Sequence, residues 1–197
     1  MMLLTTYSVA GYSIMILADS EISKHYFTDN LIVPFNPEQL QPASYDVRLG
    51  NKFWVFFPNR SMFALDLTKT DPNIEYGDEF ETSFLTLKPG DFILGVTKEK
   101  VNIPNTIVAR LEGKSSLGRA GLLVHATAGF IDPGFSGYIT LELKNIGPIP
   151  LTLRENMFIG QLSFSYMNTK PDRTYGDKEL KSHYQNQPDR PVPFRKD

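Results

Sequence analysis

The chain has no cysteine, only three histidines and no excess of basic residues. The lack of cysteine excludes disulfides, Cys-ligated zinc and a thiol nucleophile, and it favours a reducing, cytoplasmic location. The formal net charge of -2 argues against a dedicated nucleic-acid-binding protein, which usually carries a basic excess. His25, His125 and His183 do not have the spacing of metal ligands, so we interpret each of them as structural.

A long apolar segment is also missing. Residues 1–14 are mildly apolar, but no Lys or Arg precedes the apolar part, as it would in a signal peptide. The stretch is too short and too polar to span a membrane. We therefore expect no membrane partner, and we interpret residues 1–14 as a loose extension before a natural start at Met15.

What the chain does have is the material for one β-rich domain. Its 197 residues, 41% of them hydrophobic, are enough to bury a sizeable core. Short runs of β-forming residues alternate with Gly and Pro turns, which predicts a mostly β, antiparallel barrel or sandwich. Two short helices are expected, one with Asp19-Ser20 as its N-cap and one beginning near Ser115. The predicted strands are 45–49, 53–57, 84–87, 92–97, 106–111, 122–126, 138–144, 151–153 and 158–165.

The C-terminal segment, residues 168–197, is polar and contains prolines but shows no strand or helix periodicity. We therefore predict a single β domain over residues 15–167, followed by a C-terminal arm. Such an arm is either inert or becomes ordered by a ligand or a neighbouring subunit. Tyr175, Tyr184 and Gln187 are ordinary solvated residues unless the arm closes on something.

The loop GKSSLGR at residues 113–119 has the groups that a triphosphate needs. Backbone N–H groups at a helix start, hydroxyls and two cations all favour phosphate oxygens. The alternative is that Ser115 or Ser116 simply caps the short helix. A P-loop is excluded, because Val108 stands where the first glycine of that motif would be.

Apolar and polar residues alternate along Tyr138–Lys144, so Glu142 shares one face of the strand with Tyr138 and Thr140. This face is either solvated or lines a pocket, where partial desolvation would adapt Glu142 to acid–base work. The sequence Asp132-Pro133-Gly134 predicts a turn. Asp132 is either a functional carboxylate or only a turn residue, since Asp is common at the first turn position for local hydrogen bonding.

These stretches resemble the dCTP deaminases, a family that shares its fold with the trimeric dUTPases. The matching segments are ASYDVRLGNKF at residues 43–53, GKSSLGR through ITLELKN at residues 113–145, IGQL at residues 159–162, and the tail. The resemblance covers the chain from about residue 16 to its end. It implies a distorted antiparallel β-barrel or jelly-roll of the dUTPase-like type, and a homotrimer with its sites between subunits.

The resemblance also implies roles for individual residues. Glu142 would be the catalytic acid–base, with Arg119 and Ser115 orienting water and glutamate, and Asp132 would contact the deoxyribose 3′-hydroxyl. In the arm, relatives have Lys-Tyr before their final Gln where this chain has His183-Tyr184, so Lys181 is the nearby candidate for a phosphate contact. The implied nucleotide-binding set is Lys114, Ser115, Ser116, Leu117, Gly118, Arg119, Asp132, Thr140, Leu141, Glu142, Gln161, Tyr175 and Gln187.

The implied reaction is hydrolytic deamination of dCTP at C4 of the cytosine. Zinc-dependent nucleobase deaminases carry H-x-E and P-C-x-x-C signatures. This chain has neither, so we expect no zinc and no metal-ligating residues. Mg²⁺ is expected on the triphosphate oxygens, held mainly by the nucleotide. Feedback inhibition by dTTP is left open.

Three enzymatic interpretations compete. The product is dUTP, or the α–β phosphate bond is also cleaved to give dUMP for dTTP synthesis, or the chain is a plain dUTPase. Glu142 argues against the last, because plain dUTPases lack a carboxylate at the matching position. Gly129 and Phe130 favour the dUMP-forming interpretation, because deaminases that stop at dUTP often carry bulky basic residues there. A catalytically inactive nucleotide-binding relative is the non-enzymatic alternative, and the intact set of candidate catalytic residues argues against it.

Overall fold

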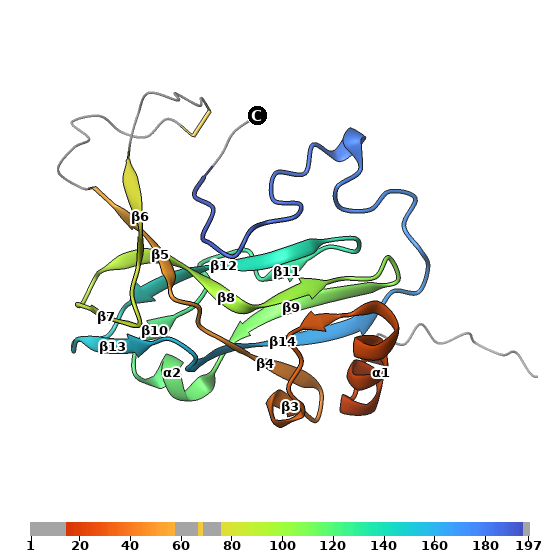
Figure 1. The fold of residues 1–197 in the computed structure, drawn as a ribbon, viewed down its shortest axis with the longest axis horizontal. Coiled ribbons are helices and arrows are strands. Elements are labelled where there is room, and N and C mark those ends of the chain that lie inside the picture. Colours follow the sequence, from red (N-terminus) through yellow and green to blue (C-terminus); the bar gives the residue numbers. More distant parts are fainter. Residues whose placement is uncertain (1–14, 58–66, 69–75, 195–197) are drawn as a thin grey trace, which may run out of the picture.

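The computed structural model describes residues 15–57, 67–68 and 76–194 (Figure 1). Two six-stranded antiparallel sheets and one two-stranded sheet enclose a single hydrophobic core. The expected extension at residues 1–14 lies outside the described residues. In the part of the chain that is described, no helix is long and apolar enough to cross a membrane.

The first sheet has the strand order β11-β9-β14-β4-β3, and β1 also pairs with β14. Its longest ladder joins β9 and β14 in antiparallel register from Gly113 opposite Gly160 to Ile107 opposite Tyr166. Its strands are β1 (Met15–Ile16), β3 (Leu40–Gln41), β4 (Ser44–Arg48), β9 (Ile107–Gly113), β11 (Phe130–Ile131) and β14 (Phe158–Tyr166).

The second sheet has the order β10-β12-β8-β5-β6, and β2 also pairs with β8. Its centre is the pair of long strands β8 and β12, and β12 carries Thr140 and Glu142 of the candidate site. Its strands are β2 (Ile32–Val33), β5 (Lys52–Phe56), β6 (Gly77–Glu81), β8 (Phe92–Asn102), β10 (Leu122–Leu123) and β12 (Ser136–Asn145). The small sheet pairs β7 (Phe84–Leu87) with β13 (Leu151–Arg154).

Strand alternation builds the core. Leu141 and Leu143 of β12 and Leu162 and Phe164 of β14 are fully buried, while their neighbours on each strand point the other way. Burial of each such side chain contributes about 1.5–3 kcal/mol, so these two strands are firmly placed. The predicted inward face of residues 138–144 is confirmed at Leu141 and Leu143, and Ile139 is only partly buried.

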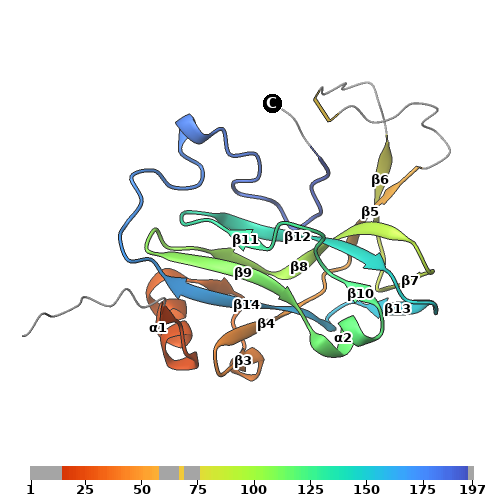
Figure 2. The same ribbon diagram turned by 180° about the vertical axis from the view of Figure 1, so that it is seen from behind.

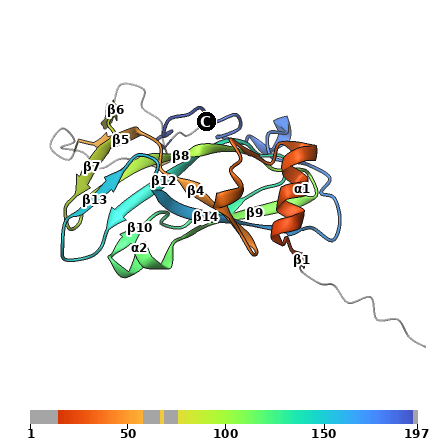
Figure 3. The same cartoon turned by 60° about the horizontal axis from the view of Figure 1, so that its bottom comes forward.

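The two α-helices lie at the edges of the sheets (Figure 3). The first, α1 (Asp19–Asp29), buries Ile22 and ends at Asn30 in the left-handed conformation. Its N-cap is Ala18 rather than the predicted Asp19-Ser20, and the acidic Asp19 in the first turn favours the positive end of the helix dipole. The second, α2 (Ser115–Arg119), begins where predicted and contacts β10. Two 3₁₀ helices are η1 (Pro37–Gln39) and η2 (Lys178–Leu180).

Every predicted strand is present, although some bounds differ. β8 runs on to Asn102, five residues beyond the prediction, and β10 has only two residues where five were expected. The strand β6 was missed because its sequence GDEFE is acidic and lies at the end of the sheet, where only one face needs apolar residues. The short β1, β2, β3 and β11 were also missed, because two residues carry no periodicity.

The C-terminal arm, defined here as residues 168–194, leaves β14 and runs back over β11 and β12 (Figures 1 and 2). It has little regular structure, as predicted, apart from η2 and a parallel bridge between Gly137 and Gln187. Its last described residues approach β5 and β6, where Tyr76 Oη donates a hydrogen bond to Phe194 O at 2.7 Å. The arm therefore spans the outer face of the second sheet.

Candidate active site

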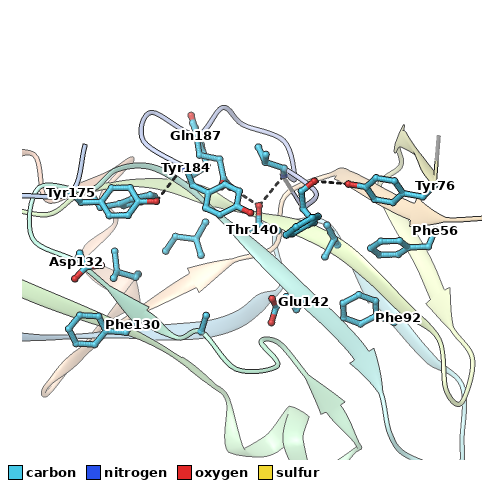
Figure 4. A pocket seen from close by; sticks show the side chains of 18 residues that line it. Phe56, Tyr76, Phe92, Phe130, Asp132, Thr140, Glu142, Tyr175, Tyr184 and Gln187 are labelled. Carbon is cyan, nitrogen blue, oxygen red and sulfur yellow. Dashed lines mark hydrogen bonds between the residues drawn. The ribbon is translucent and has the colours of Figure 1, made fainter. Parts of the chain in front are cut away.

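A cavity of about 440 Å³ lies between β12 and the C-terminal arm (Figure 4). The floor comes from β12 and β8, one end from the segment after β10, and the cover from the arm. Both carboxylates of the predicted site, Asp132 and Glu142, line it. The lining residues are Phe56, Tyr76, Phe92, Leu94, Ala128, Phe130, Ile131, Asp132, Phe135, Tyr138, Ile139, Thr140, Glu142, Tyr175, Tyr184, Gln187, Val192 and Phe194.

Glu142 is half-buried on the cavity face of β12, opposite Leu94 in β8. Its Oε2 atom accepts a hydrogen bond from the Ala126 backbone N–H at 2.5 Å. A second tie runs between the backbones, where Glu142 N–H donates to Val124 O at 3.0 Å. The carboxylate is thus oriented by one oxygen, and the other oxygen remains available for proton transfer.

Asp132 opens the predicted turn at the end of β11. Phe135 N–H donates to Asp132 O at 3.2 Å, and Gly134 has a φ of 89°, which glycine adopts at no steric cost. A Cβ at Gly134 would lie 2.7 Å from the Cβ of Thr174, so the arm passes close over this turn. Asp132 is exposed, and its side chain points into the cavity (Figure 4).

The arm is attached to β12 around Gln187, which is only 7% exposed. Gln187 Nε2 donates to Thr140 Oγ1 at 2.7 Å, and Tyr138 N–H donates to Gln187 O at 3.1 Å. Gly137 has a φ of 155°, and a Cβ there would lie 2.7 Å from Gln187 N. Bare backbone at residue 137 is therefore what allows the arm to lie against β12.

Tyr175 and Tyr184 bring the arm over the Asp132 end of the cavity. Tyr184 N–H donates to Tyr175 Oη at 3.1 Å, and the Tyr175 ring packs edge-on against Phe135 at 5.6 Å. Burial raises the pKa of Tyr175 above its usual value, so its phenol stays protonated at neutral pH. The sequence predicted a solvated Tyr184 unless the arm closes on something, and here the arm lies over the cavity and Tyr184 lines it.

The opposite end of the cavity is aromatic, and no local sequence signal indicated this. Phe56 stacks with Phe92 at 5.5 Å and with Tyr76 at 6.2 Å between ring centroids. Phe194 and Val192 of the arm cover this group. Phe56 belongs to β5, Phe92 to β8 and Tyr76 to the residue before β6, so only the fold brings them together with the arm. Tyr138 was not predicted as a site residue, although the alternation along residues 138–144 placed it on the same face of the strand as Glu142.

The remaining predicted residues do not line the cavity. Ser115, Ser116 and Arg119 of α2 are exposed, and α2 and the arm lie on opposite sides of β12 (Figures 1 and 2). The N-cap position of α2 is Lys114, and it makes no side-chain cap hydrogen bond. The serine hydroxyls therefore do not serve as its N-cap. Leu117 packs partly against the core, and Gly118 has open space around it.

Lys114 and Gln161 lie together near β4. Lys114 Nζ is 2.7 Å from Oδ1 of the buried Asp46 and lies 5.7 Å from the centre of the Phe158 ring. Gln161 stands opposite Asp46 in the β14–β4 ladder and accepts a hydrogen bond from Ser44 Oγ at 3.2 Å. Leu141 is fully buried in the core, so only its backbone can meet a ligand.

A second cavity of about 490 Å³ adjoins the first, and the two share Phe130, Asp132 and Tyr175 as lining residues. It lies between β9, the end of β14 and the arm. Arg173, Lys181 and His183 line it, so its walls carry positive charge next to Asp132. Arg173 is also 3.8 Å from Glu179 in a solvent-exposed ion pair. The His183 position, doubtful as a phosphate contact from the sequence, thus faces the same space as Lys181.

The other histidines have local partners. His25 Nδ1 is 2.7 Å from Asp29 Oδ2, and His25 Nε2 is 2.8 Å from Tyr166 Oη, so His25 joins α1 to β14. His125 lies against Gly129, where a Cβ would be 3.3 Å from its Cε1 atom. Among the described residues, no group of three or more His, Cys, Asp or Glu side chains could hold a metal ion.

Three comparisons with known proteins agree. A family model described as dCTP deaminase-like matches residues 16–167. A protein of Halobacterium salinarum, named "dCTP deaminase, dUMP-forming", is 47% identical over 184 residues, covering 88% of this chain and 91% of its own. A protein of the same name from Pseudarthrobacter chlorophenolicus is 43% identical over 175 residues, with the same two coverages.

One solved structure also matches. The 2′-deoxycytidine 5′-triphosphate deaminase of Agrobacterium tumefaciens aligns with a TM-score of 0.61 at 23% identity. The alignment covers 78% of this chain but 49% of that one, so the chain spans about half the length of that structure. The likeness supports the mostly β, antiparallel fold predicted from the sequence.

Proposed function

This chain belongs to the dCTP deaminase-like family, and from that membership we propose that it converts dCTP to dUMP, pyrophosphate and ammonia. The observation that carries the proposal is Glu142, a carboxylate held by the Ala126 N–H in a cavity, in a chain 47% identical to a dUMP-forming relative. The net reaction consumes two waters, one at C4 of cytosine and one at the α-phosphate.

Glu142 is the acid–base group of the deamination. Its free carboxylate oxygen takes a proton from the attacking water as the new C4–O bond forms. The proton then passes to N3 of the ring, and a second transfer accompanies the departure of ammonia and leaves uracil. The Ala126 N–H keeps the carboxylate in one orientation, so the group does not have to be repositioned between the two transfers.

The nucleotide lies along β12. The cytosine stands at Glu142, and the deoxyribose points toward Asp132, whose carboxylate accepts a hydrogen bond from the 3′-hydroxyl. Thr140 and the backbone of Leu141 lie next to the base. The arm, with Tyr175 and Gln187, forms the cover that separates the reacting carbon from bulk solvent.

The serine and arginine groups of α2 act in a neighbouring copy of the chain. Ser115, Ser116 and Arg119 are exposed and lie on the far side of β12 from their own cavity, which fits a homotrimer whose sites form between subunits. Arg119 then orients the water and offsets charge that develops during attack. Large apolar residues near α2 are exposed in the single chain and fit an interface, namely Leu123, Ile146, Ile149 and Phe158.

The phosphates extend into the second cavity, toward Arg173, Lys181 and His183. Mg²⁺ would be held mainly by the phosphate oxygens of the nucleotide. When bound, the ion neutralises charge on the triphosphate. Lys114 is paired with Asp46 in the single chain, which fixes the loop before α2, and its contact with the triphosphate stays a prediction.

The dUMP-forming branch is favoured by the structure around Gly129. A Cβ there would lie 2.6 Å from Leu111 O, because Leu111 N–H donates to Gly129 O at 2.7 Å and holds the two backbones together. A bulky residue is therefore excluded from residue 129 unless the backbone moves. Its neighbours Ala128 and Phe130 line the cavity together with Asp132, so this tight backbone contact fixes the wall beside Asp132, where we place the water that attacks the α-phosphate.

Product analysis tests the proposal. The protein is incubated with dCTP and Mg²⁺, and a time course is separated by chromatography, with dTTP added in parallel to test for inhibition. We expect dUMP, pyrophosphate and ammonia in equal amounts with little dUTP. Stoichiometric dUTP would leave a simple deaminase, dUMP formed only from added dUTP would leave a plain dUTPase, and no turnover of either nucleotide would leave an inactive binding protein.

A further inference from the structure

The ladder between β8 and β12 contains an irregularity beneath the cavity. Tyr138 pairs with Lys100, and Thr140 pairs with Val96. Residues 97–99 of β8 therefore stand opposite a single residue of β12, which is a β-bulge. Bulges leave backbone groups without a ladder partner and re-aim side chains next to active sites. The groups that replace the missing ladder bonds therefore determine where the next residues of β12 lie.

Thr97 supplies the replacement. It is 1% exposed, and its hydroxyl makes two hydrogen bonds. The O–H donates to Glu99 O at 2.8 Å across the bulge, and the same oxygen accepts from Ile139 N–H at 3.0 Å. One hydroxyl thus closes the bulge on itself and ties it to the opposite strand. Thr97 does not line the cavity.

Glu99, which lies in the bulge on β8, ties the bulge to the other sheet through Arg48 of β4. Its carboxylate is fully buried and accepts hydrogen bonds from Arg48 N–H at 2.8 Å and from Arg48 Nε at 2.7 Å. Gln39 Nε2 donates to the same carboxylate at 3.0 Å. A buried carboxylate with three donors is rigidly held, so the bulge is a fixed support for β12.

Ile139 lies between the two places where Gln187 of the arm is attached. On one side, Tyr138 N–H donates to Gln187 O, and on the other, Thr140 Oγ1 accepts from Gln187 Nε2 at 2.7 Å. Val192 N–H adds a third attachment, to the same Thr140 oxygen at 3.1 Å. The bond from Ile139 to Thr97 thus holds the middle of the segment on which the arm rests.

We propose that Thr97 is a positioning residue that fixes residues 138–140 in the geometry on which the C-terminal arm docks. It acts through Ile139 and touches neither the substrate nor the reacting atoms. Without the hydroxyl, Ile139 N–H has no partner, segment 138–140 can shift, and the oxygen that receives Gln187 and Val192 moves with it. The effect on turnover rests on the proposed function, whereas the effect on docking of the arm does not.

The test compares two substitutions with a matched control. Thr97→Val keeps the shape and removes both hydrogen bonds, and Thr97→Ser keeps the hydroxyl. Thr152→Val removes a hydroxyl from an exposed strand position, where Thr152 Oγ1 is 3.3 Å from Thr86 Oγ1 and remote from the arm. All variants are measured well below the lowest melting temperature, so that loss of folded protein does not contribute.

The first measurement is amide hydrogen exchange without nucleotide. Asn186 N–H donates to Ser136 O at 2.8 Å, so its exchange reports release of the arm from β12. In Thr97→Val we expect this amide to exchange about 5–150-fold faster, the range that corresponds to leaving one buried N–H unpaired. Thr97→Ser and Thr152→Val should exchange as the wild type does, and core amides of β14 should be unchanged in all variants.

The second measurement is steady-state kinetics with dCTP. Because the arm covers the nucleotide, KM should rise by about the same factor in Thr97→Val, while kcat stays within about 3-fold. A merely structural role would lower the melting temperature and leave both KM and the Asn186 amide unchanged, which overturns the proposal. A raised KM with unchanged exchange also overturns it. If the wild type releases no ammonia from dCTP, the proposed function fails, and the exchange data alone still decide the role of Thr97.

Discussion

At the scale of single residues, the site depends on how polar groups are oriented by backbone. Glu142 is aimed by one backbone N–H, from Ala126, and Thr140 receives two donors from the arm on one oxygen. Gly137 matters because it has no side chain, since a Cβ would collide with the arm. Function here resides in a few atoms whose positions are set by neighbours far away in sequence.

Replacing Glu142 tests its role as the acid–base group. Glu142→Gln keeps the shape but cannot accept the proton from water, so we expect ammonia release to fall by about 10²–10⁴-fold, with binding of a non-hydrolysable dCTP analogue largely kept. Ammonia release and calorimetric binding are measured on the same preparation. Glu38→Gln, at an exposed position of η1, is the control. Release within a few-fold of the wild type would remove Glu142 from the catalytic role.

A second residue-scale prediction concerns the cluster that joins α1 to β14. The hydrogen bond from Tyr166 Oη at 2.7 Å, helped by the charge of Lys24, holds the pKa of Glu21 below its usual 4.5. A carboxyl group whose pKa is lowered in the folded protein stabilises the fold when the pH is above the usual pKa. This stabilisation is lost as the pH falls through the lowered pKa.

Glu21→Gln should therefore lower the melting temperature at pH 7, and the difference from the wild type should shrink as pH falls below 4.5. Thermal unfolding at a series of pH values, with Glu38→Gln as the surface control, measures it. If the melting temperatures of Glu21→Gln and the wild type differ by the same amount at every pH from 7 downward, the charge of Glu21 does not stabilise the fold.

At the scale of elements, the arm and β12 form the working unit. Residues 185–187 lie against the start of β12 through backbone bonds, and Lys52–Asp189 and Arg190–Glu79 ion pairs, at 2.8 and 3.2 Å, join the following segment to β5 and β6. Exposed ion pairs of this kind contribute little individually. The arm is thus held mainly by hydrogen bonds at Gln187 and Val192, and the two ion pairs between these residues add little.

Removing the arm from Tyr175 onward should leave a folded core and raise KM for dCTP strongly, because the cover of the cavity is lost. The melting temperature of the truncated chain checks that the core is intact. A companion measurement is protease cleavage of the full chain with and without a non-hydrolysable dCTP analogue. Equal cleavage under both conditions, together with an unchanged KM, would contradict a role for the arm in covering the nucleotide.

The sequence predicted those elements whose pattern is local. The 138–144 alternation predicted β12 and the face of Glu142, and the Asp-Pro-Gly signal predicted the turn at Asp132. It did not predict the aromatic end of the cavity, because Phe56, Tyr76 and Phe92 meet only through strand pairing. The sequence also did not predict the bulge at Thr97. A bulge is a property of two paired strands, and the sequence around residue 97 is that of a regular strand.

At the scale of the whole molecule, the residues of the proposed site lie on two opposite faces of one chain. The cavity with Glu142 lies under the arm, and the exposed Arg119 of α2 lies on the far side of β12. A single chain cannot bring these groups together without refolding its second sheet. A ring of copies can, if each chain offers α2 to the cavity of the next.

Mixing two inactive variants tests this arrangement. Arg119→Ala and Glu142→Gln should each be nearly inactive alone, and co-assembled mixtures should regain about a quarter of wild-type sites, because such a site needs an intact Glu142 from one chain and an intact Arg119 from its neighbour. The co-expressed mixture is compared with a control in which the two variants are purified separately and mixed at low temperature, so that their subunits do not exchange. Activity no higher than that of either variant alone would place both groups in the same chain.

If the reaction takes place in the cavity, as proposed, the arm that covers it also sets the order in which the products depart. Ammonia is small enough to escape past a cover held by a few hydrogen bonds, whereas the larger pyrophosphate and dUMP would be retained while the arm stays docked on Thr140. We expect ammonia to be lost first, with the two phosphate-bearing products retained until Thr140 releases the arm. The uracil nucleotide then stays beside the second water long enough to be hydrolysed before it meets the solvent.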